Sequence, residues 1–220
     1  MHYCMFKGVN SNDLDLFMES VPPKVRPQLR VEQKTIPGRD GVLTVSDGAY
    51  DNFIRQAEFV VFDFSRIDEI TEYFSGSGWL TFDDEPEKRY RASVINQIPF
   101  SQIIRCANRI PVEFDCYPYA FESSPQTAEN PHILYNLGNV ESKPTIEIYG
   151  NGDCILEVNG KLFEVRGVKE SATIDSENLL AYSGGSLLIT KGEFPAFKIG
   201  ENSLDWTADR LVVKPNWRWI

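Results

Sequence analysis

The clearest pattern of apolar and polar positions lies in residues 104–116. Even positions there are almost all apolar, as at Ile110 and Phe114, whereas odd positions are mostly charged, as at Arg109 and Glu113. Alternation with a period of two predicts a β-strand with one buried face. Pro111 falls on the polar face and has no N–H to donate, so we expect an edge strand or a bulge at that position.

This strand is long for a small domain. At roughly 3.3 Å per residue it would span about 40 Å, and its expected partner is the segment 90–98. An unpaired edge of that length invites association, and closed cyclic symmetry covers such edges. The pattern therefore predicts that the strand is covered by a second copy of the chain in a closed assembly.

The rest of the first half predicts more strands and one helix. Residues 57–64 are rich in β-branched and aromatic residues, which predicts a strand, and residues 79–82 predict another strand for the same reason. Between them, Ser65 is an expected N-cap, and apolar residues at helical spacing follow until Gly76 and Gly78 end the helix. The apolar stripe of this helix should lie on a sheet. Residues 83–86 predict a solvated acidic turn, for which a bound cation is the weaker alternative.

The second half follows an expected linker at residues 122–131, in which Ala128 is the single aliphatic residue. Asn159 and Gly160 separate two alternating runs, which is the strongest short signal for a hairpin with both turn residues at positive φ. Short strands recur between glycine-containing turns, and no helix signal interrupts them, so we expect a β-sandwich. The expected strands are residues 145–149, 154–158, 161–165, 171–174, 187–190 and 210–213, with another at the C-terminus.

Composition and charge narrow the function. The 220 residues are ordinary for a globular protein, with 42% hydrophobic and 25% charged residues and a net charge of −10. Nucleic-acid affinity comes mostly from basic residues that neutralise phosphates, so we expect no bound DNA. The nearest approach to a basic patch, diluted by Glu32 and Asp40, we interpret as solvated loop charge: Lys24, Arg26, Arg30, Lys34 and Arg39. No apolar run suits a membrane span, and no leader is evident, so we expect synthesis in a cytoplasm and no membrane partner.

Candidate chemistry is sparse. Cys4, Cys106, Cys116 and Cys154 lack the spacing of a zinc site and are expected as reduced thiols. A catalytic triad would need one of the two histidines, His2 or His132, and neither lies in a segment that predicts preorganisation. The 32 acidic residues leave a glycosidase-like pair of carboxylates open, without marking one. We therefore predict no catalytic, cofactor-binding or metal-binding residues and no cofactor, and no enzyme.

Aromatic residues offer the remaining candidate site. Tyr117, Tyr119 and Phe121 share one face if the long strand continues, and Trp217 and Trp219 do the same near the C-terminus. Such faces can stack on sugars, but packing in a core or interface is favoured because aromatic side chains dominate burial.

Taken together, the motifs resemble those of the distal tail proteins (Dit) of long-tailed phages (siphophages) and of prophages in Gram-positive bacteria. In the first half the resemblance is carried by Phe6-Lys7-Gly8-Val9-Asn10-Ser11-Asn12-Asp13, Ile36-Pro37-Gly38-Arg39-Asp40-Gly41, Gly78-Trp79-Leu80-Thr81-Phe82 and Tyr90-Arg91-Ala92. In the second half it is carried by Pro144-Thr145-Ile146-Glu147-Ile148-Tyr149-Gly150, Ile174-Asp175-Ser176, Gly192-Glu193-Phe194-Pro195, Gly200-Glu201-Asn202 and Trp217-Arg218. The match covers nearly the whole chain, in order.

The resemblance implies a mainly β, two-domain fold. Residues 1–125 would be a ring-forming, β-sandwich-like domain with one helix, and residues 131–220 a galectin-like β-sandwich. It further implies a structural baseplate hub at the virion tail tip: a homohexameric ring that links the tail tube to the tail-tip and receptor-binding apparatus. The implied partners are the tail tube protein, the tape-measure protein, the tail-tip or tail-associated lysin protein and a receptor-binding protein.

Phage DNA would pass through the ring without being bound, so the resemblance also implies a net-negative lumen. The alternative function is a carbohydrate-binding module that uses the C-terminal sandwich for glycans on the host surface. The short length of the chain leaves no room for the carbohydrate-binding insertions of longer family members.

Overall fold

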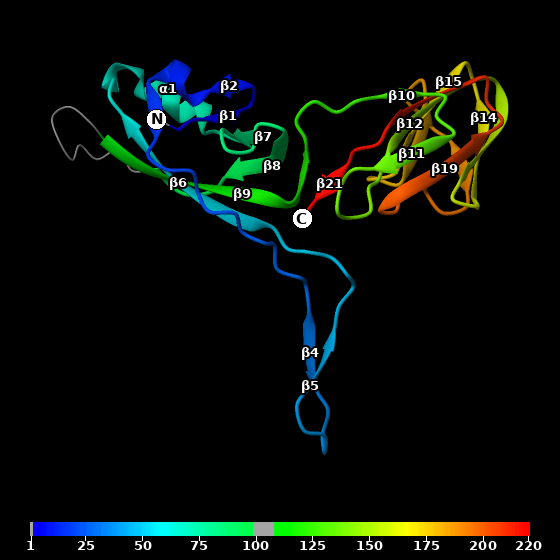
Figure 1. Ribbon diagram of the computed structural model, residues 1–220, viewed down its shortest axis with the longest axis horizontal. Helices are drawn as coiled ribbons and strands as arrows, with labels where there is room; N and C mark the ends of the chain where they lie inside the picture. The colour runs from blue at the N-terminus through cyan, green and yellow to red at the C-terminus, as the bar shows by residue number, and fades with distance from the viewer. Residues whose placement is uncertain (1, 99–107) are drawn as a thin grey trace. The chain divides into compact units, whose positions relative to one another are not determined.

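A computed structural model describes residues 2–98 and 108–220. The chain divides into two compact units (Figure 1), of which the first ends at Ser123 and the second runs from Ser124 to Trp219. The mainly β fold class expected from the sequence is confirmed. No helix in the described part of the chain has the length and apolarity that a membrane span requires.

The N-terminal domain is built on one antiparallel sheet. Its strands follow the order β2-β1-β7-β8-β9-β6-β3. Their bounds are β1 Cys4–Phe6, β2 Val9–Asn10, β3 Leu16–Met18, β6 Phe53–Val61, β7 Ser77–Phe82, β8 Lys88–Val94 and β9 Asn108–Glu122. Two 3₁₀ turns, η1 Ser11–Leu14 and η2 Phe64–Arg66, and the helix α1 Ile67–Tyr73 complete the domain.

The strand β9 confirms the predicted alternation: Ile110, Val112, Phe114 and Cys116 are fully buried, and the residues between them are more exposed. The expected position at a sheet edge is wrong for the strand as a whole. β6 pairs with β9 over nine residues on one side, and β8 pairs with it on the other. The predicted partner segment 90–98 therefore accounts for only one of the two neighbours of β9. Residues 104–107 of the predicted strand lie outside the described residues.

Pro111 is tolerated because β8 stops short of it. The last β8 residue in register is Val94, opposite Phe114. Beyond that point the Asn96 side-chain amide donates to the Pro111 carbonyl at 2.9 Å, and its Oδ1 accepts from the Glu113 N–H. In a strand, the nitrogen and carbonyl of one residue point the same way, so the proline nitrogen faces the side that β8 has left.

The helix α1 packs one face on the sheet, as expected. Ile70, Tyr73 and Phe74 are buried, and Tyr73 and Phe74 make ring contacts with Phe6 and Phe59. The expected cap at Ser65 is wrong. Asp63 Oδ1 instead accepts from both the Ser65 N–H and its hydroxyl, which forms a turn one step earlier. Of the two glycines expected to end the helix, Gly78 belongs to β7.

Residues 28–48 form an element that the sequence pattern did not predict. Here β4 (Glu32–Thr35) and β5 (Val42–Val45) make a two-stranded hairpin whose residues are all exposed (Figure 1). Its tip is a β-turn in which the Arg39 N–H donates to the Ile36 carbonyl at 3.1 Å. Pro37 and Gly38, the latter at φ 78°, occupy the positions that a type II turn favours. We call residues 28–48 the arm.

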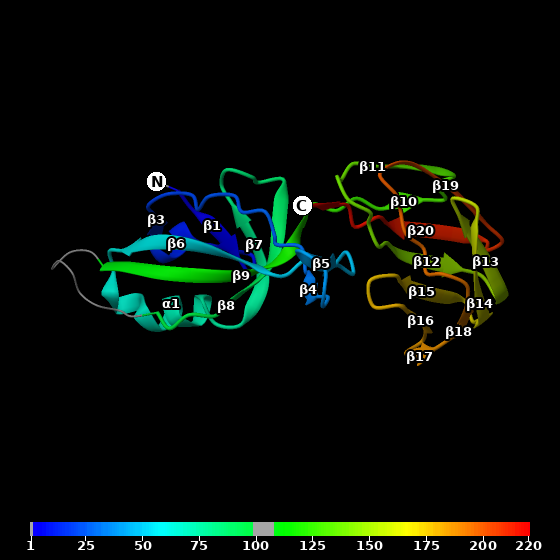
Figure 2. The ribbon, with the colours of Figure 1, turned by 90° about the horizontal axis from the view of Figure 1, so that it is seen from below.

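The C-terminal domain is a sandwich of two antiparallel sheets, ordered β10-β20-β12-β15-β16-β17 and β11-β19-β13-β14-β18. Figure 2 shows β12, β15, β16 and β17 side by side. The bounds are β10 Ala128–Glu129, β11 Ile133–Asn136, β12 Thr145–Tyr149, β13 Gly152–Val158, β14 Lys161–Val168, β15 Ser171–Asp175, β16 Leu180–Ser183, β17 Ser186–Leu187, β18 Ile189–Lys191, β19 Gly200–Trp206 and β20 Arg210–Lys214. The short strand β21, Arg218–Trp219, lies outside these two sheets.

Alternate residues of both sheets meet in one core, including Ile146, Leu156, Phe163, Ile174 and Leu211. The predicted strand over 187–190 is interrupted, because the chain leaves one sheet after β17 and enters the other at β18. The expected linker 122–131 is shorter than predicted, since Glu122 ends β9 and β10 already begins at Ala128.

Candidate interaction surfaces

Aromatic and arginine side chains lie on one face of the N-terminal sheet, opposite the face that packs against α1. Trp79 on β7 is in register with Arg91 on β8. The Arg89 guanidinium lies 4.0 Å from the centre of the Trp79 ring, and that of Arg91 lies 4.8 Å from the Phe121 ring. Tyr117 stacks on Phe121 with centroids 6.2 Å apart, as the predicted shared face requires. Cations over aromatic faces are attracted by the ring quadrupole, more strongly where water is excluded.

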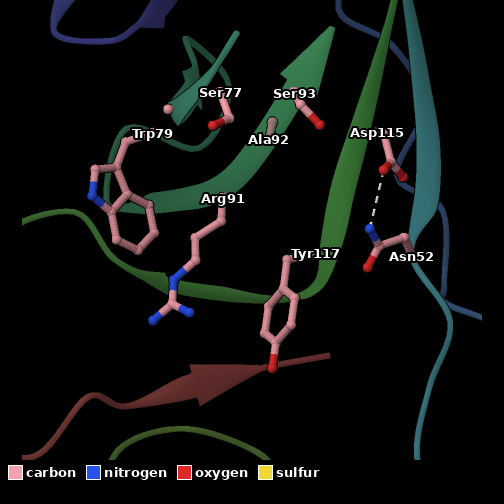
Figure 3. Close-up of a pocket in the computed structure, with 9 residues that line it drawn as sticks. Asn52, Ser77, Trp79, Arg91, Ala92, Ser93, Asp115 and Tyr117 are labelled. Carbon is pink, nitrogen blue, oxygen red and sulfur yellow. Dashed lines mark hydrogen bonds between the residues drawn. The ribbon is translucent and has the colours of Figure 1, made fainter. Parts of the chain in front are cut away.

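A cavity of about 390 Å³ opens beside this cluster. Figure 3 shows Trp79, Arg91 and Tyr117 around it, with Asn52 and Asp115 on the other side joined by a hydrogen bond of 3.1 Å. Flat rings beside amide, carboxylate and guanidinium groups are chemically suited to a polar ligand with apolar faces. This cavity was not singled out from the sequence, although the predicted face of Tyr117, Tyr119 and Phe121 pointed to one of its walls.

The C-terminal domain has a second cavity, of about 350 Å³. Lys161 and Glu193 face each other across 2.7 Å on its rim, and their hydrogen bond raises the pKa of Lys161 and lowers that of Glu193. Asn159 also lines it, as do Phe163 and Phe194, whose rings lie 4.7 Å apart. The chemistry of this cavity is mixed, with apolar walls and a charged rim.

The base of the arm is fastened to the N-terminal domain by buried polar groups. Arg55 points into the core with 1% exposure, stacks on Phe82 at 4.0 Å and donates to the Pro22 carbonyl at 2.7 Å. Glu85 is also buried, so the expectation of a solvated turn at residues 83–86 is wrong for this residue. It pairs with Lys24 at 2.9 Å and Lys88 at 3.3 Å. Burial disfavours ionisation of Glu85, but these hydrogen bonds outweigh it and hold its pKa below the ordinary value.

The two histidines lie in different domains and have different neighbours. His2 contacts Asp83 at 2.9 Å, and His132 stacks on Trp206 with ring centroids 4.7 Å apart. Trp217 is 6% exposed and packs on Phe197 in the core of the C-terminal domain, so it offers no exposed platform. Trp219 packs against the same core.

Three cysteines, Cys4, Cys116 and Cys154, are buried free thiols, and Cys106 lies outside the described residues. Burial raises the pKa of both Cys4 and Cys116 to about 12, so neither supplies a thiolate near neutral pH. Within the described residues, no three His, Cys, Asp or Glu side chains are grouped as metal ligands.

Comparisons with known proteins give a structural answer but no match by sequence: neither a family model nor a curated protein matches the chain. A similar solved structure is the crystal structure of the SPP1 Dit (gp 19.1) protein, described as a paradigm of hub adsorption apparatus in phages that infect Gram-positive bacteria. The TM-score is 0.76, the sequence identity is 15%, and the match covers 97% of each chain. The resemblance to distal tail proteins is therefore confirmed at the level of the fold.

Proposed function

We propose that the protein is a structural hub of a phage or prophage tail tip, and that six copies form a ring there. The observation that carries this proposal is the likeness to SPP1 Dit across 97% of both chains, which extends over both domains. The ring joins the tail tube protein to the tail-tip or tail-associated lysin protein, in contact with the tape-measure and receptor-binding proteins. The role is mechanical and non-catalytic.

The ring is tested by its mass and shape. Six subunits of 25.1 kDa give a particle of about 151 kDa. Light scattering coupled to gel filtration of concentrated protein should detect that mass, and negative-stain images should show closed rings with sixfold symmetry. A stable closed ring of another number, or a monomer that persists to millimolar concentration, would refute the proposed assembly.

The carbohydrate-binding alternative rests on the C-terminal cavity. Two aromatic rings, Phe163 and Phe194, and the polar side chains of Asn159 and Lys161 line it, which is a mixture that sugar recognition uses. A glycan array separates the two functions, because a purely structural hub should bind none of its sugars. Binding that is lost in a Phe194→Ala variant would favour the alternative.

A further inference from the structure

The cavity of the C-terminal domain is built around a short antiparallel pairing. Ser142 and Phe197 exchange two backbone hydrogen bonds of 3.0 Å, and both residues are fully buried. Successive side chains of a paired segment point to opposite sides, so the residues next to these two face away from the core. Four such residues line the cavity: Glu141, Lys143, Ala196 and Lys198. Its volume of about 350 Å³ is that of a site for a small ligand.

Two buried or half-buried polar groups of this cavity lack a partner within the described residues. Ser176 lines the cavity and is 1% exposed, and its hydroxyl has no hydrogen-bond partner in the part of the chain that the structure describes. The Ser176 N–H donates to the Pro144 carbonyl at 3.1 Å, which places Ser176 beside the residue that follows Lys143. Lys143 is half-buried and forms no ion pair among residues 2–98 and 108–220. A hydroxyl and an ammonium both donate, so a ligand that supplies acceptor atoms would satisfy both.

The charged side chains of the lining favour an anion. Three lysines and two glutamates line the cavity, although the chain as a whole has a net charge of −10. Glu193 pairs with Lys161 at 2.7 Å and is the main cause of the raised pKa of Lys161, and the charge of Glu141 raises it further. Both glutamates therefore act on the same lysine. Lys143 and Lys198 remain without an ion pair in the described residues. Lys143, which is half-buried, is the one for which a counter-ion matters most, because water solvates it less.

Apolar side chains shape the rest of the cavity. The Phe163 and Phe194 rings lie 4.7 Å apart with their planes tilted by 50°. Asn159 also lines the cavity, but its amide group is already bonded to Asn202 and Ser203. The unsatisfied donors and the rings together fit a ligand with an apolar face and an anionic edge. A sugar ring that carries an oxyanion has both, and its size suits the cavity.

We propose that this cavity binds a sugar ring that carries one oxyanion, either a carboxylate or a phosphate ester. The Lys143 ammonium pairs with the oxyanion, the Ser176 hydroxyl donates to it, and Phe194 packs against the ring. The inference rests on the carbohydrate-binding alternative, for which it names the ligand class. All the residues involved belong to one C-terminal domain, so a tail hub can carry the site without any change to the proposed ring.

The first test compares sugars that differ in charge. Isothermal titration calorimetry of the full chain is run with D-glucuronate, glucose 6-phosphate and glucose as probes. Glucuronate has the ring of glucose with a carboxylate in place of the hydroxymethyl group. We expect one or both charged sugars to bind about tenfold more tightly than glucose, or better, because a hydrogen bond to a charged group is stronger than a neutral one. The tighter of the two identifies the oxyanion. Equal affinities for all three, or no binding of either charged sugar at millimolar concentration, would overturn the proposal.

The second test separates binding from folding. Ser176→Ala removes a buried hydroxyl that has no partner in the described residues, so the unliganded protein should be at least as stable as the wild type. Its affinity for the charged sugar should nevertheless fall about tenfold. Lys143→Gln should reduce that affinity to the level of glucose, and Lys143→Arg should preserve the preference for charge. The matched control, Lys169→Gln, changes an exposed lysine outside the cavity and should have no effect. Variants at Ser176 and Lys143 that bind as the wild type does would contradict the proposed contacts.

The outcomes keep this inference apart from the two functions above. Neutral glycans that bind through Phe194 with no preference for charge would support the carbohydrate-binding alternative and overturn the oxyanion site. Charged sugars that bind only when Lys143 and Ser176 are intact would support the site, whether or not the same protein forms sixfold rings. Loss of the ring in light scattering, with this binding retained, would refute the hub alone.

Discussion

The turn between β13 and β14 provides a sharp test of how this sequence specifies its fold. Asn159 and Gly160 have φ values of 52° and 81°, and they connect the paired residues Val158 and Lys161. Two central residues at positive φ are the mark of a type I′ hairpin, as the sequence predicted. Asn159 also fastens the turn to β19, because its amide donates to Asn202 Oδ1 at 2.8 Å and its Oδ1 accepts from the Ser203 N–H at 3.2 Å.

Replacing Gly160 with Val isolates the backbone contribution. A Cβ added at Gly160 meets no atom within 4 Å, so the substitution creates no clash with a neighbour. The cost is that of holding a β-branched residue at positive φ, about 1–3 kcal/mol. For a domain of this size, 1 kcal/mol corresponds to a shift of about 4–8 °C in Tm. The C-terminal domain of Gly160→Val should therefore melt at least about 4 °C below that of the wild type.

The assay is calorimetric unfolding of the full chain, with urea unfolding as a second measure. Gly160→Asn is the matched control, because asparagine enters the left-handed region more readily than any β-branched residue, and it should recover most of the lost stability. A Gly160→Val protein that melts within a degree of the wild type would refute the reasoning. Equal losses for Val and Asn would show that positive φ is not the cause.

Three further predictions concern the linker, the buried carboxylate and the ring lumen. Limited proteolysis should cut first within residues 124–127, which are exposed and lie outside any strand; first cuts elsewhere would contradict this. Glu85→Gln should destabilise the N-terminal domain by about 1–3 kcal/mol at pH 7. Since the folded pKa of Glu85 is lowered, its contribution is present above the unfolded pKa and lost as pH falls through the folded one, so wild type and variant should converge in acid. Finally, a net-negative lumen predicts no retention on a double-stranded DNA column at low salt, and retention there would contradict it.

The parts of this fold that could be predicted from the sequence are those that depend on residues close together along the chain. The strand Thr145–Tyr149 and the Asn159-Gly160 turn were predicted at their observed positions, because each depends on residues within a few places of one another. The predicted cap at Ser65 was wrong for a related reason: α1 begins one residue later, after Arg66, which makes no side-chain cap hydrogen bond. Asp63 and Ser65 are both residue types that can accept a hydrogen bond from a backbone N–H at the start of a helix. The local pattern does not decide which of the two side chains does so.

Non-local pairing was out of reach of the same reasoning. The register of β6 with β9 joins Phe53 to Cys116, and no alternation within either strand states which partner it takes. The arm was missed because it has no buried face and therefore no period to detect. Pro37-Gly38 was the available signal, since proline followed by glycine favours a type II turn and the flanking residues can pair.

The position of β9 changes the physical argument for assembly. A long strand at a sheet edge would demand a partner through its unpaired N–H and C=O groups, but β9 has β6 along one side and β8 along the other. What this domain leaves uncovered is instead a thin hairpin with exposed Val42 and Leu43. A hairpin that is marginally stable on its own gains stability when another surface covers its apolar face and orders it.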